Sequence, residues 1–151
     1  MYSKILGAFL AVSLLGACSS SDKETTTRAS VGTGSTAADP LSGGGDKVFF
    51  DLDRSVIRDD ARATLDNQAN WLDTNRTVNV QIAGDCDERG TAEYNLALGS
   101  RRAFAAATYL AAKGVASARV TTISYGKDRP IAPGSTEEAW AQNRNAITSV
   151  R

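Results

Sequence analysis

The segment from Val78 to Ala103 most strongly limits what this chain of 151 residues can fold into. Its first part, Val78 to Ala83, alternates apolar and polar residues, which predicts a strand with one buried face. A turn with several charged side chains follows Gly84, and a long Ala-rich helix is expected from about Thr91. This order places carboxylates at the end of a strand, beside a helix N-terminus, with arginines two to three turns along the helix. The segment therefore favours a small pocket for a ligand that carries both charges.

The rest of the chain continues the alternation of strands and helices. Strands are expected at 47–51, 78–83, 119–125 and 146–150, and helices at 59–75, 91–113 and 136–143. The helix of 91–113 has a face of small residues that lets it approach a sheet closely, made by Gly99, Ala103, Ala106, Ala107 and Leu110. The order β-α-β-α-β-α-β predicts an α/β (α+β) two-layer sandwich, in which helices pack on one face of a four-stranded mixed sheet.

The first 17 residues have the features of a secretory signal peptide. Lys4 precedes an apolar run, Ile5 to Leu15, which is too short to span a bilayer. Residues 15–18 (Leu-Gly-Ala-Cys) resemble a bacterial lipobox, in which the cysteine is acylated and becomes the mature N-terminus. Ser19 stands where an Asp would resemble an inner-membrane retention signal, which favours the outer membrane. We expect a signal peptide at 1–17 and lipidation of Cys18, with an ordinary secretory signal as the alternative.

Residues 18–45 predict a flexible linker that follows the lipid anchor. They are rich in Ser, Thr, Gly and Ala and contain almost no large apolar residue, so they cannot bury enough surface to fold. The folded domain is expected at 46–151. A tail with no spacing role would have the same composition.

Composition excludes several classes of function. The 17 basic and 17 acidic residues balance, so nothing indicates attraction to nucleic acid. The chain has no histidine, which removes the commonest general base and metal ligand. Cys18 and Cys86 fit no zinc or redox spacing, and Cys86 is expected to be a small semi-buried residue. We therefore expect neither a metal nor another cofactor.

Pairs of carboxylates leave one catalytic alternative open. Two acids that flank a glycosidic bond are the machinery of a glycoside hydrolase, and Asp53 with Asp87 would be the candidates here. However, acid pairs are common on solvated loops, and nothing in the sequence places these two acids across a substrate.

Motifs between Val48 and Val150 resemble those of the OmpA-like peptidoglycan-binding domain. They recur in order at near-constant spacing: Phe50-Asp51-Leu52-Asp53, Asp87-Glu88-Arg89-Gly90-Thr91, Glu93-Tyr94-Asn95, Leu98-Gly99, Arg101-Arg102-Ala103, Ser124-Tyr125-Gly126-Lys127, Pro130 and Asn143-Arg144. The resemblance implies non-covalent binding of the peptide stem of peptidoglycan through its diaminopimelate residue. Asp87 matches the acid that receives the ligand's ammonium, and Arg102 matches the base that holds a stem-peptide carboxylate. The matches to supporting positions around the pocket are Asp53, Arg89, Asn95 and Leu98.

Two positions depart from the family pattern. Asp85 stands where His or Asn is usual, and its charge near Asp87 would raise the pKa of one of the two carboxylates. Asn145 stands where a second Arg is usual, so a supporting contact is expected to be missing. Both departures bear on ligand affinity, and a binding module that keeps only a protein partner is a further alternative.

A lipid-anchored member of this family implies an outer-membrane lipoprotein that faces the periplasm and ties the membrane to the cell wall. The resemblance further implies a place in the Tol system, which supports envelope integrity and cell division, with TolB as a partner on an overlapping surface. Such a tether needs no catalyst.

Overall fold

The computed structural model describes residue 41 and residues 43–151. The predicted signal peptide, Cys18 and most of the predicted linker lie outside the described residues. The elements are β1 (Lys47–Phe49), α1 (Asp59–Thr74), β2 (Val80–Asp85), α2 (Ala92–Ala112), the short 3₁₀-helix η1 (Ser117–Arg119), β3 (Val120–Gly126), α3 (Glu137–Asn143) and β4 (Asn145–Val150). Within this described part, no helix is both long enough and apolar enough to cross a membrane.

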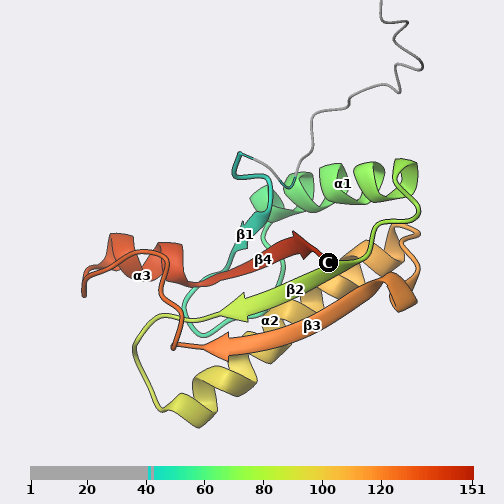
Figure 1. The fold of residues 1–151 in the computed structure, drawn as a ribbon. Coiled ribbons are helices and arrows are strands. Elements are labelled where there is room, and N and C mark those ends of the chain that lie inside the picture. Colours follow the sequence, from blue (N-terminus) through green and yellow to red (C-terminus); the bar gives the residue numbers. More distant parts are fainter. Residues whose placement is uncertain (1–40, 42) are drawn as a thin grey trace, which may run out of the picture. The chain divides into compact units, whose positions relative to one another are not determined.

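The strands form one mixed sheet in the order β1-β4-β2-β3 (Figure 1). β2 and β3 are parallel, and β4 is antiparallel to both of its neighbours, β1 and β2. Buried residues of α1 and α2 join the same core, so both long helices cover the same face of the sheet. The predicted fold class is confirmed. The short helix α3 lies beyond the end of the sheet at which β4 begins, as Figure 1 shows.

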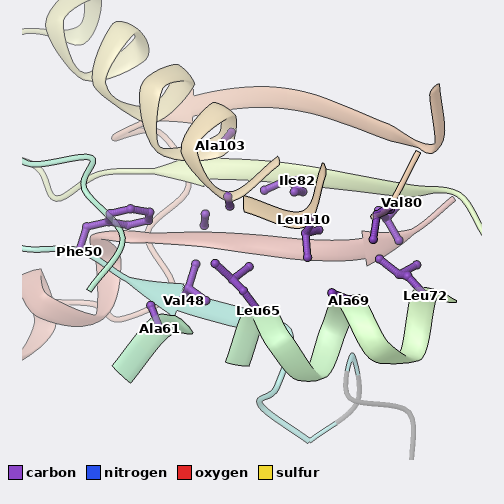
Figure 2. Close-up of a cluster of buried hydrophobic side chains, with 13 residues drawn as sticks. Val48, Phe50, Ala61, Leu65, Ala69, Leu72, Val80, Ile82, Ala103 and Leu110 are labelled. Carbon is purple, nitrogen blue, oxygen red and sulfur yellow. The ribbon is translucent and has the colours of Figure 1, made fainter. Parts of the chain in front are cut away.

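The core lies between the sheet and the two long helices (Figure 2). Leu65 and Leu72 of α1 and Leu110 of α2 are fully buried against the sheet. The buried apolar residues of α1 are spaced by three or four positions, which keeps them on one face of the helix. The labelled members of this core are Val48, Phe50, Ala61, Leu65, Ala69, Leu72, Val80, Ile82, Ala103 and Leu110.

Two glycines let α2 lie directly against the sheet. A Cβ added at Gly84 in β2 would stand 1.8 Å from the carbonyl oxygen of Gly99, and one added at Gly99 would stand 2.3 Å from Ser124 Oγ. Only a residue without a side chain fits at either position. The close approach brings the end of β2 beside the first half of α2, where the charged residues of both elements gather.

Element boundaries differ from the prediction near Arg119. Its guanidinium donates hydrogen bonds to the carbonyl oxygens of Leu72, Asn75 and Val78 at 2.7–3.0 Å. The carbonyl of Val78 is therefore engaged by a side chain, and β2 begins at Val80 rather than at Val78. At its other end β2 continues to Asp85, which places Asp85 in the strand instead of the predicted turn.

Candidate functional site

A cavity of about 200 Å³ lies where β2 ends and α2 begins. It contains all the predicted site residues: Asp53, Asp87, Arg89, Asn95, Leu98 and Arg102. The remaining lining residues, which sequence reasoning did not assign to the site, are Leu52, Cys86, Gly90 and Tyr94. The fold thus gathers the predicted residues at one place, and their role in binding stays a prediction.

Arg102 forms the deep cationic wall of the cavity. Its side chain points from α2 toward three backbone carbonyls, and the residue is only 1% exposed. Nε donates to Arg54 O at 2.9 Å, Nη1 to Asp85 O at 2.8 Å and Nη2 to Asp51 O at 3.2 Å. Burial lowers the pKa of Arg102, but a guanidinium still keeps its proton. Among the residues that the structure describes, no carboxylate forms an ion pair with Arg102, which lines the cavity.

Asp87 supplies the buried carboxylate of the cavity. Arg89 donates to it from its backbone N and Nε at 3.1 Å and from Nη2 at 2.6 Å, and Arg144 Nη1 lies 3.3 Å from Oδ2. Burial raises the pKa of Asp87, but the hydrogen bonds from both arginines outweigh this effect and hold the pKa below its usual value. The carboxylate is therefore ionised at neutral pH, and its protein partners are Arg89 and Arg144 instead of Arg102.

Asn95 and Thr91 fix the loop that carries Asp87. Asn95 Nδ2 donates to the carbonyls of Arg89 and Thr91 at 2.7 and 3.1 Å. Thr91 caps α2, because its Oγ1 accepts a hydrogen bond from the backbone N–H of Tyr94 at 3.2 Å. Leu98, one turn after Asn95, gives the cavity a buried apolar wall. Asn95 thus acts on the shape of the loop through its side chain.

Cys86 lies deeper than the sequence indicated. It is 3% exposed, and its thiol donates to Asn95 O at 3.3 Å. Burial raises the pKa of the thiol, which disfavours the nucleophilic thiolate. Cys86 is thus fully buried, whereas the sequence predicted a small semi-buried residue.

Asp53 stands at the rim of the cavity. The hydroxyl of Tyr94 donates to Asp53 Oδ1 and links the loop after β1 to the first turn of α2. Asp53 has a φ of +56°, a left-handed conformation that Asp tolerates better than most residues. The bend lies between Asp51 and Arg54, whose carbonyls accept hydrogen bonds from Arg102.

The two departures from the family pattern lie outside the cavity lining. Asp85 is 1% exposed, and its Oδ2 forms an ion pair with Arg129 Nη2 at 2.9 Å. Its pKa is raised because burial outweighs the effect of Arg129, so the cause differs from the like-charge effect of Asp87 that the sequence predicted. Asn145 is fully buried and donates to Gln142 O at 2.7 Å. Within the described chain, Asp85 Oδ1 and Asn145 Oδ1 have no hydrogen-bond partner.

Sequence reasoning missed the role of Arg144 and Trp140. Arg144 joins Asp87 to Glu137 Oε1, the latter at 2.8 Å, and its Nε donates to Phe50 O. Trp140 lies under the guanidinium of Arg89, 4.1 Å from the ring centroid. Arg144 belongs to a quoted motif, but nothing in the sequence links it to a carboxylate 57 residues away.

The OmpA family model matches residues 49–144, which include every residue that lines the cavity. The chain belongs to the OmpA family. The peptidoglycan-associated lipoprotein of Brucella melitensis is 44% identical over 149 residues, which cover 95% of this chain and 88% of that protein. The protein of the same name from Mesorhizobium japonicum is 54% identical over 106 residues, or 70% of this chain and 63% of the relative.

Solved structures show the same fold as this OmpA-family chain. The peptidoglycan-associated lipoprotein from Burkholderia pseudomallei has a TM-score of 0.68 at 40% identity, over 70% of this chain and 90% of that chain. The C-terminal domain of Helicobacter pylori MotB has a TM-score of 0.65 at 21% identity, over 70% of this chain and 84% of that chain. At 21% identity, the likeness to the MotB domain shows only that the two proteins share a fold.

Proposed function

We propose that this protein is an outer-membrane lipoprotein that binds the peptide stem of peptidoglycan without covalent chemistry and ties the outer membrane to the cell wall. The observation that carries the proposal is that the ionised carboxylate of Asp87 lines the same cavity as the guanidinium of Arg102, which has no acidic partner among the described residues. The amino acid centre of diaminopimelate offers an ammonium and a carboxylate side by side, which matches this pair.

Arg102 is suited to hold the ligand's carboxylate. Its guanidinium is fixed by hydrogen bonds to three carbonyls, so little side-chain entropy remains to be lost when a ligand binds. A buried guanidinium also binds a carboxylate more strongly than an exposed one, because water screens the interaction less.

Asp87 can receive the ligand's ammonium once Arg89 gives way. Arg89 is about one-third exposed, while Arg144 behind Asp87 is nearly buried. Arg89 has other partners that remain when it leaves Asp87: the ring of Trp140 and Glu137 Oε2, 3.7 Å from Nη1. We infer that ligand binding exchanges the Arg89–Asp87 contact for an ammonium–Asp87 contact.

The lipid anchor at Cys18 and a place in the Tol system are proposed from the sequence and from its relatives. The Brucella relative, a peptidoglycan-associated lipoprotein by name, matches 95% of this chain. On this basis we place the domain in the periplasm at the end of the 18–45 linker, with TolB as protein partner and with functions in envelope integrity and cell division.

In a hydrolase that uses Asp53 and Asp87, Asp87 is unsuited to be the general acid. A general acid needs a carboxyl group whose pKa is raised, whereas the pKa of Asp87 is lowered. Among the carboxyl groups near the cavity, the raised pKa belongs to Asp85, which does not line the cavity.

Co-sedimentation with purified sacculi tests the proposal. The full chain in detergent is compared with Asp87→Asn and Arg102→Lys, after circular dichroism has shown that each variant folds. Asp87→Asn removes one partner of a buried charge contact, which should cost about 2–5 kcal/mol, and Arg102→Lys loses the planar two-point hydrogen bonding to a carboxylate. Both variants should therefore stay in the supernatant. Asp85→Asn, two residues from Asp87 but outside the cavity, is the matched control and should pellet like the wild type.

Three results would contradict the tether. The first is equal pelleting of the wild type and both cavity variants. The second is release of soluble muropeptides from the sacculi, which would favour the hydrolase. A folded wild type that never pellets would favour a module that binds only a protein partner.

A further inference from the structure

Four charged side chains beside the cavity form a closed ring. Asp87 Oδ2 lies 2.6 Å from Arg89 Nη2 and 3.3 Å from Arg144 Nη1. Glu137 contacts the same two arginines, with Oε2 at 3.7 Å from Arg89 Nη1 and Oε1 at 2.8 Å from Arg144 Nη2. The side chain of Asp87 is 6% exposed and lines the cavity, whereas that of Glu137 is 62% exposed and lies outside it. The two acids therefore share the same two arginines.

The two arginines differ in their freedom to leave Asp87. The side chain of Arg144 is 8% exposed, and its Nε also donates to Phe50 O at 3.2 Å. The side chain of Arg89 is 34% exposed, and among the described residues it donates hydrogen bonds to Asp87 alone. Arg89 is therefore the member of the ring that a ligand can displace.

Trp140 and Glu137 are placed to receive the displaced guanidinium. The ring of Trp140 lies 4.1 Å from the guanidinium of Arg89, and its Nε1 donates to Glu88 Oε1 at 3.1 Å, which fixes the ring. Glu137 Oε2 stands at 3.7 Å from Arg89, a distance that can still shorten, whereas Oε1 is already bonded to Arg144. A shift of Arg89 from Asp87 toward Glu137 keeps its contact with the aromatic ring.

The helix α3, which carries both receivers, is held at its two ends. Thr136 caps its first turn. At its last residue, the side chain of Asn143 makes three hydrogen bonds of 2.8–2.9 Å with the backbone of residues 131–132. Glu137 and Trp140 therefore stay in place when Arg89 moves.

We propose that Glu137 is a positioning residue that raises the affinity of the cavity for the stem peptide by drawing Arg89 away from Asp87. The proposal rests on the proposed function, because the ligand's ammonium is what replaces Arg89. In the free protein Glu137 competes with Asp87 for Arg89, and in the complex it gives Arg89 an acidic partner. Without Glu137, Arg89 stays on Asp87 and opposes the ammonium. Arg144 keeps its contacts in both states, so its bond to Glu137 does not alter the affinity.

A double-mutant cycle between Glu137 and Arg89 tests this role. Calorimetry measures binding of a stem peptide with diaminopimelate at its third position to the full chain in detergent. Glu137→Gln should weaken binding by at least about threefold. Glu138→Gln removes the same charge from the next residue, which forms no ion pair in the described part of the chain, and should leave binding unchanged. In an Arg89→Gln background, Glu137→Gln should change the affinity by less than about 1.5-fold, whereas a merely structural role would act in both backgrounds.

The arginine Nε–H signals in NMR spectra give a second readout, after circular dichroism has shown that each variant folds. Saturation with the peptide should shift the signal of Arg89, which leaves Asp87, and leave that of Arg144 nearly unchanged. Equal or tighter binding by Glu137→Gln, the same loss in both backgrounds, or a shift of the Arg144 signal alone would overturn the role of Glu137 while the proposed function holds. A folded wild type that does not bind the peptide would overturn both.

Discussion

Replacing Asp85 by Asn should stabilise the folded protein at neutral pH. The carboxylate is 1% exposed, and its Oδ1 has no hydrogen-bond partner in the described residues. A buried polar atom left unpaired costs about 1–3 kcal/mol, and the cost is larger when the group is charged. Arg129 offsets part of this cost, but its side chain is 43% exposed and its pair with Asp85 is partly screened by water. Asn keeps an acceptor for Arg129 and leaves its Nδ2 unpaired in place of the carboxylate oxygen. The expected gain of about 1–2 kcal/mol therefore comes from removing the buried charge.

The pH dependence has a definite sign. Burial raises the pKa of Asp85 in the folded state above its ordinary value of 3.8. An acid of this kind contributes stability below its unfolded pKa and loses that contribution as the pH rises through its folded pKa. The advantage of Asp85→Asn is therefore complete above the folded pKa, shrinks as the pH falls through that pKa, and vanishes below the unfolded value.

Urea unfolding followed by circular dichroism, at about pH 7 and about pH 3.5, measures both effects. Asp128→Asn, at an exposed acid, is the matched control and should change stability by less than about 0.5 kcal/mol at either pH. A less stable Asp85→Asn at neutral pH would show that the ion pair with Arg129 outweighs the cost of burial. An advantage that stays the same at both pH values would refute the titration of Asp85 as its cause.

Three further predictions follow from single contacts. Gly99→Ala should destabilise the fold by at least about 2 kcal/mol in urea unfolding, because its methyl group would meet Ser124 Oγ and the Gly84 carbonyl. The control Ser100→Ala, on the exposed face of α2, should be nearly neutral. Equal effects of the two substitutions would refute the close approach of α2 to the sheet. Thr91→Ala should cost about 1 kcal/mol through loss of the α2 cap while Thr91→Ser costs less, and equal losses would exclude the capping bond. Arg144→Gln should raise the pKa of Asp87, which a carboxyl NMR titration measures. The substitution should also reduce the stability that the lowered pKa contributes at pH values above the unfolded pKa of Asp87. An unchanged pKa would mean that Arg89 alone lowers the pKa of Asp87.

The helices and strands could be predicted because the buried face of each one follows from the local spacing of its apolar residues. The spacing of Ala61, Leu65, Ala69 and Leu72 identified the buried face of α1, and the small residues around Gly99 predicted close helix–sheet packing. The sheet order β1-β4-β2-β3 could not be predicted from the sequence, because it depends on pairing between the first and last strands.

The candidate site was predictable where motifs marked it and unpredictable where distant residues meet. The positions of Asp87 and Arg102 followed from motifs close to each other in the sequence. The contact between Asp87 and Arg144 arises only when β4 is inserted between β1 and β2, which brings the end of α3 to the loop after β2. The charge of Asp85 was expected to act on the cavity, but its side chain pairs with Arg129 instead.

The most direct test of the proposed function is an NMR titration of the full chain with two stem peptides that differ only in diaminopimelate or lysine at the third position. Lysine has the same ammonium but lacks the neighbouring carboxylate. If Arg102 holds that carboxylate, the diaminopimelate peptide should shift the signals of the cavity residues and bind at least about tenfold more tightly than the lysine peptide. Equal affinity for both peptides, or shifts confined to residues outside the cavity, would contradict recognition by the Asp87–Arg102 pair.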